Sequence, residues 1–139
     1  MNKQERLEAI NKLIEFISER GRQFFRTKVT VAGELIEIIA EMKLINGRVY
    51  YIDPYTKKQV TVRDTSIGWD GFSSGGTLRS LVLDFADFIR TGKDTNGNHG
   101  YGGLYATGWG HSEEVQKEII DYAKEIGYLK YEIIQQSDH

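Results

Sequence analysis

Hydrophobic residues near the start of the chain recur every three to four positions. This spacing predicts an amphipathic helix from Gln4 to Arg20, with Glu and Lys on its opposite face and Gly21 after its end. The stripe expected to be buried consists of Leu7, Ile10, Leu13, Ile14 and Ile17.

From Phe24 onward the spacing of the hydrophobic residues changes to two, which is typical of a strand. Phe, Thr and Val at odd positions alternate with Arg, Lys and Thr over 25–31, and a similar alternation runs over 35–45. Asn46-Gly47 follows, a dipeptide that favours a two-residue hairpin turn because both positions need a positive φ. We therefore expect the next strand over 48–52.

A second turn is predicted at Asp53-Pro54, because Pro fixes its own φ and an Asp side chain accepts hydrogen bonds from nearby backbone. Val60 and Val62 indicate one more strand.

Two helices are predicted in the C-terminal half. One has an apolar stripe over 78–89, with Thr77 as its N-cap and Gly92 after its end. The other is capped by Ser112 and ends at Gly127. With a closing strand over 128–134, the expected order is α-β-β-β-β-α-α-β. We therefore expect a single α+β domain over 1–139, in which the three helices pack on one face of an antiparallel β-meander.

The composition bounds the possible functions. Among 139 residues there are 18 Lys and Arg against 20 Asp and Glu, and no Cys, which excludes disulfides, thiol nucleophiles and cysteine-based metal sites. No stretch has the features of a signal peptide or a membrane span, so we expect the chain in the cytoplasm of its host cell. Glycine is unevenly distributed, since 11 of the 15 lie within 64–111 together with both Trp. We therefore look for a binding surface there.

The glycine-rich stretch over 68–77, with the helix that follows it, forms the first candidate site. Glycine lets a ligand approach the free N–H groups at a helix start, and hydroxyl and guanidinium donors nearby would help to hold a phosphate. The alternative is a plain turn with a helix cap. The predicted anion cradle consists of Ser73, Ser74, Gly75, Gly76, Thr77 and Arg79.

The long connection over 92–111 is the second candidate, because a segment of this length without secondary structure is uncommon in a compact domain. Its rings could stack on a flat ligand or contact a protein partner, or they could anchor the segment to the core. The residues that would form the contact face are Tyr101, Tyr105, Trp109 and His111.

Direct catalysis has little support in the sequence. His99 and His111 could act as a general base in a small hydrolase, but no nucleophile elbow and no third metal ligand of fixed spacing accompany them. We therefore expect no catalytic residues, no metal and no cofactor. Basic residues interleaved with aromatics over 20–28 could contact nucleic acid, although a helix end followed by an edge strand is the favoured interpretation.

The segments 72–81, 88–93 and 108–111, with the helix that follows, resemble small phage and prophage accessory proteins. The resemblance implies a non-enzymatic protein that acts against a host defence process by binding. The expected ligand is a phosphate-bearing, nucleotide-like molecule. The alternative is protein–protein inhibition of a host defence or nucleic-acid-processing complex, as anti-CRISPR proteins do. We also expect the chain to self-associate.

Overall fold

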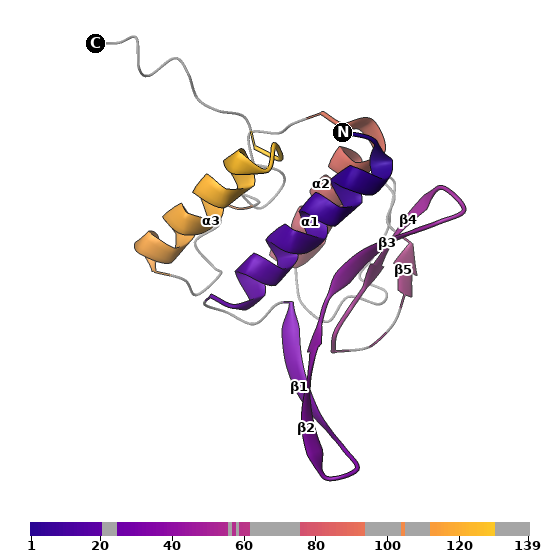
Figure 1. The fold of residues 1–139 in the computed structure, drawn as a ribbon, viewed down its shortest axis with the longest axis vertical. Coiled ribbons are helices and arrows are strands. Elements are labelled where there is room, and N and C mark those ends of the chain that lie inside the picture. Colours follow the sequence, from indigo (N-terminus) through magenta and orange to yellow (C-terminus); the bar gives the residue numbers. More distant parts are fainter. Residues whose placement is uncertain are drawn as a thin grey trace.

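The computed structural model describes residues 1–20, 25–55, 57, 59–61, 76–93, 104 and 112–129, with backbone alone for 59–61 and 76–80. Its elements follow the expected α+β order of a helix, antiparallel strands and two helices (Figure 1). The closing strand expected over 128–134 lies outside the described residues beyond 129. The elements are α1 (Lys3–Ser18), β1 (Arg26–Val31), β2 (Glu34–Ile39), β3 (Glu41–Ile45), β4 (Arg48–Ile52), β5 (Gln59–Thr61), α2 (Gly76–Thr91) and α3 (Glu113–Glu125).

The described strands form two antiparallel sheets. β1 pairs with β2, and β3, β4 and β5 follow one another as a meander. The alternation over 35–45 is therefore shared between two strands that belong to different sheets. Ala40 lies between them, and its N–H donates to the carbonyl of Phe25 at 2.8 Å.

Both hairpins close with the same two-residue turn. Asn46 and Gly47 have φ values of 51° and 79°, as the sequence predicted. Ala32 and Gly33, which join β1 to β2, have nearly the same values of 52° and 83°. Two consecutive positive φ angles define the type I′ turn, whose twist matches that of the strands it joins.

The helix ends follow their capping residues closely. The Asn2 side chain accepts from the N–H of Glu5, and the Ser112 side chain accepts from the N–H of Val115, so the predicted cap of the last helix is confirmed. Gly92 lies just after α2 with a positive φ of 76°, also as predicted. α2 begins at Gly76, so Thr77 is a helical residue and not the N-cap that we expected.

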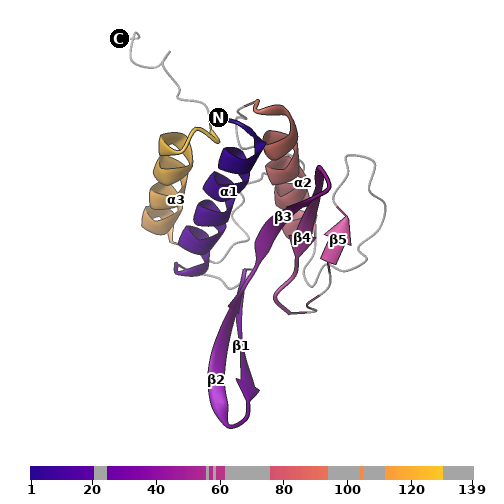
Figure 2. The same cartoon turned by 45° about the vertical axis from the view of Figure 1, so that its right-hand side comes forward.

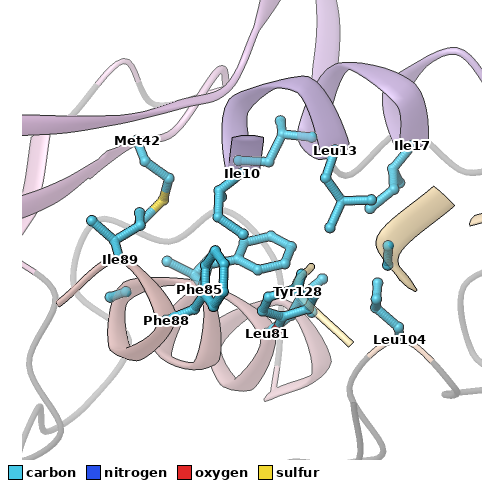
Figure 3. Packing of buried hydrophobic residues seen from close by; sticks show 14 of the residues in the cluster. Ile10, Leu13, Ile17, Met42, Leu81, Phe85, Phe88, Ile89, Leu104 and Tyr128 are labelled. Carbon is cyan, nitrogen blue, oxygen red and sulfur yellow. The ribbon is translucent and has the colours of Figure 1, made fainter. Parts of the chain in front are cut away.

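α2 and α1 together form the centre of the core. Every residue from Leu81 to Ala86 is buried, and contacts join α2 to α1 and β4, while α1 also packs against β3 and α3. Within the described part of the chain, no helix has the length and hydropathy to cross a membrane. Figure 3 shows the packing of side chains from α1, β3 and α2 around Phe85, with Leu104 and Tyr128 beside them.

Candidate functional site

The β1–β2 hairpin projects from the body formed by the helices and the second sheet, and both views show it extending away (Figure 1, Figure 2). Among the hydrogen bonds of the described residues, two lie at its base. One joins Ala40 N–H to the Phe25 carbonyl at 2.8 Å, and the other joins the Tyr55 hydroxyl to the Arg26 carbonyl at 2.8 Å. The strands beyond this base pair with each other in a continuous register to the turn.

One face of the hairpin carries aliphatic side chains along most of its length, with Thr27 near the base and Glu34 beside the turn. Opposed residues of an antiparallel pair share a face, so the register places Val29 beside Ile36 and Thr27 beside Ile38 on the same side. Val31 extends this face to the tip. We call Val29, Val31, Ile36 and Ile38 the aliphatic stripe.

The aliphatic stripe extends from the buried hydrophobic core onto the exposed part of the hairpin. At the base, Phe25 and Ala40 are buried; Val29 and Ile38 are partly buried; farther out, Ile36 is 41% exposed and Val31 is 52% exposed. Hydrophobic residues that are covered by the body at one end are thus open at the other. Contiguous exposed apolar surface of this kind is typical of an interaction site.

Apart from Glu34, the charged residues of the hairpin lie on its opposite face. Lys28 is directly opposite Glu37, and a guanidinium nitrogen of Arg26 lies 3.2 Å from a carboxylate oxygen of Glu37. Leu35, 64% exposed, is on this charged face near the tip. The hairpin is therefore an amphipathic ribbon whose apolar side has no charge of its own except Glu34 beside the turn.

The basic and aromatic residues over 20–28 are used inside the molecule where the structure describes them. The Arg20 guanidinium lies 3.4 Å from the centre of the Phe16 ring, and this ring stacks on Tyr122 of α3 with centroids 4.4 Å apart. Phe25 is buried in the core. These contacts agree with the structural interpretation of the segment; nucleic-acid binding stays untested.

A buried polar pair joins α2 to the end of α3. The Tyr128 hydroxyl donates to the carboxylate of Asp84, and both side chains are buried. Burial, followed by the charge and the hydrogen-bond acceptor of Asp84, raises the pKa of Tyr128 well above its ordinary value. Tyr128 is therefore neutral over the physiological range and holds the two helices together, which is a structural role.

Half of the predicted anion cradle lies outside the described residues. This is true of Ser73, Ser74 and Gly75, whereas Gly76, Thr77 and Arg79 are in the first turns of α2, where only the backbone is described. The predicted aromatic face is also outside this part of the chain: Tyr101, Tyr105, Trp109 and His111, as well as His99. Phosphate binding at these positions remains a prediction.

Beyond Lys93, Leu104 is the residue of the long connection that the structure describes. Leu104 is buried in the hydrophobic core, and its carbonyl accepts from the side-chain amide of Gln116 on α3 at 3.2 Å. At this point the connection is anchored to the domain through Leu104. The aromatic residues of the alternative interpretation lie outside the described residues.

Sequence reasoning did not single out the hairpin as a functional surface. The alternation over 25–31 and 35–45 predicted strands with one apolar face, but the same alternation occurs whether or not that face is covered. The exposure of Val31, Leu35 and Ile36 emerges only from the structure.

Comparison with known proteins identifies the relatives of this chain. The YoqU family model matches residues 1–135. The SPbeta prophage-derived uncharacterized protein YoqU of Bacillus subtilis (strain 168) is 31% identical over 128 residues, which cover 90% of this chain and 83% of that protein. No solved structure matches. The expected similarity to small prophage proteins is confirmed, and the chain belongs to the YoqU family.

Proposed function

We propose that this chain is a non-enzymatic binding protein that acts on a process of its bacterial host by holding a host protein with the β1–β2 hairpin. The observation that carries the proposal is the aliphatic stripe, which continues from buried Phe25 and Ala40 out to Val31 at 52% exposure. A relative encoded by a prophage supports the setting, since such a protein works inside a bacterial cell.

The chemistry of the stripe favours a protein over a small polar ligand. Its β-branched aliphatic side chains offer no hydrogen-bonding or charged group to a phosphate, whereas an apolar surface on a partner would be removed from water together with them. The charges of Lys28 and Glu37 lie on the other face, where they keep that side of the hairpin hydrated.

Two neighbouring residues at the tip provide a matched pair of variants. Val31→Lys places a charge on the aliphatic stripe, and Thr30→Lys places the same charge on the opposite face. Both positions are exposed, so both variants should fold. Each variant, with the wild type, is used as bait in a lysate of a Bacillus host, and proteins retained by the wild type are purified for titration.

We expect a purified partner to bind the wild type and Thr30→Lys with similar Kd values, and to bind Val31→Lys at least about tenfold more weakly. A partner that binds Val31→Lys as tightly as the wild type would overturn the proposal.

A further inference from the structure

On the basis of the proposed function, we infer that the host partner contributes an extended segment. This segment adds to the outer edge of β2 as an additional strand. The segment would alternate β-branched residues, which continue the aliphatic stripe, with basic residues on the face of Glu37. Strand addition requires backbone N–H and carbonyl groups of β2 that point away from β1.

The hydrogen-bonding pattern fixes those groups. Ala40 N–H bonds to the Phe25 carbonyl, so in an antiparallel ladder the inward-bonded residues of β2 are Ile38 and Ile36. The N–H and carbonyl groups of the residues between them, Leu35 and Glu37, therefore point away from β1. Both residues are exposed. Within the described residues, no strand pairs with this edge of β2.

On two other edges, outward backbone groups are already bonded. On β1, the outward carbonyl of Arg26 accepts from the Tyr55 hydroxyl. On β3, the N–H and carbonyl of Met42 are both bonded to the side chain of Asn11. Among the described residues, a helix thus closes the edge of β3, and the outer edge of β2 has no strand beside it.

β1, the strand that already pairs with β2, indicates which residues a second paired strand would need. β1 presents Val29 and Val31 on the aliphatic stripe, and its Arg26 and Lys28 lie on the face of Glu37. Both charged residues of β2 are acidic, Glu34 and Glu37. A partner strand with acidic residues at these positions would place like charges opposite each other, which is destabilising.

The probe is a capped synthetic peptide with the sequence of residues 26–31, and a charge-reversed peptide in which its Arg and Lys are Glu is the control. In the free protein, we expect the amides of Leu35 and Glu37 to exchange rapidly with deuterium and those of Ile36 and Ile38 slowly. The first peptide should slow exchange at Leu35 and Glu37. It should bind more tightly than the reversed peptide by about fivefold or more.

Leu35→Pro removes the outward N–H and spares the inward ladder, and proline is tolerated at such an edge position. Leu35→Ala, which keeps the N–H, is the matched control. Leu35→Pro should raise the Kd for the peptide about fivefold or more relative to Leu35→Ala. Slow exchange at Ile36 and Ile38 in Leu35→Pro verifies that the hairpin is intact. If the hairpin is lost in Leu35→Pro, the comparison is repeated at the next outward N–H with Glu37→Pro and its control Glu37→Ala.

Equal binding of the peptide to the Pro and Ala variants would overturn strand addition, as would slowed exchange at Lys28 and Thr30 in place of β2. Sedimentation could show that the wild type self-associates and that Leu35→Pro does not. The occupant of the β2 edge would then be a second copy of this chain, and the inference of a host segment would be overturned. A purified host partner that is lost with Val31→Lys but retained by Leu35→Pro would refute strand addition alone. A partner retained by both would refute the proposed function as well.

Discussion

Asn11 of α1 makes both hydrogen bonds of the Met42 backbone. Its side-chain amide donates to the Met42 carbonyl at 3.0 Å, and its side-chain oxygen accepts from the Met42 N–H at 2.7 Å. A side-chain amide here takes the place of a neighbouring strand at the edge of β3. This pair orients α1 across the edge of β3 and satisfies two polar groups beside the core.

Replacing Asn11 should therefore lower the free energy of unfolding more than the partial exposure of its side chain suggests. Asn11→Ala leaves the N–H and carbonyl of Met42 without these partners, and we expect the free energy of unfolding to fall by about 2–3 kcal/mol. Lys12→Ala, on the exposed side of the same helix, is the control and should change it by less than about 0.5 kcal/mol. Urea denaturation of the two variants measures both values, and equal losses would refute the edge-closing role of Asn11.

The two hairpin turns allow a reciprocal test of turn chemistry. Ala32 and Asn46 have φ values of 52° and 51°, but only Asn tolerates this left-handed conformation well. Ala32→Asn should stabilise the protein by about 0.5–1 kcal/mol, and Asn46→Ala should destabilise it by about 1 kcal/mol. Chemical denaturation gives both numbers. Changes of the same sign would show that the turns do not share this conformation.

Gly92 lies under the side chain of Arg6, whose Nε donates to the Ile89 carbonyl at 3.0 Å at the end of α2. A Cβ at Gly92 would lie 3.2 Å from an Arg6 nitrogen, whereas one at Gly127, which has a similar φ after α3, would make only ordinary contact with Met1. Gly92→Ala should thus cost about 1 kcal/mol more than Gly127→Ala.

The extra cost should disappear when Arg6 is absent. In an Arg6→Ala background, Gly92→Ala and Gly127→Ala should destabilise the protein by the same amount, measured as melting temperature and denaturation midpoint. A difference that persists in this background would place its cause elsewhere than in the Arg6 contact.

The raised pKa of Tyr128 predicts that the folded protein loses stability at alkaline pH. Burial and Asp84 raise its pKa in the folded state, so above about pH 10 the unfolded chain releases a proton that the folded chain retains. The free energy of unfolding should then fall by up to about 1.4 kcal/mol per pH unit for this residue. The slope between pH 10 and 11.5 should be shallower in Tyr128→Phe, whatever its stability at pH 8. Identical slopes would contradict the assignment.

Local signals in the sequence predicted the turn and the helix cap that require particular residue types. Asn46-Gly47 and the Ser112 cap were predicted because each acts through its own backbone neighbours. Ala32-Gly33 forms the same turn without the favoured Asn, so the hairpin that it closes was not recognised as a separate unit. The division at Ala40 escaped detection because the apolar alternation continues through it.

The candidate surface depended on tertiary contacts that no local pattern encodes. Met42 and Ile36 occupy equivalent positions in the same alternation, yet one is 1% exposed in the core and the other 41% exposed on the hairpin. Met42 belongs to β3, which packs against α1, whereas Ile36 belongs to β2, which packs mainly against β1. The glycine-rich cradle and the aromatic face, including Ser74 and Trp109, remain predictions.

The most direct test of the account is amide hydrogen exchange of this chain, free and in complex with the host protein that its hairpin retains. Binding should slow exchange of the exposed amides of β2, with the largest change at Leu35 and Glu37, and should leave the amides of α3 unchanged. Protection confined to α3 or to the segment after Gly92, with no change over 26–39, would contradict it.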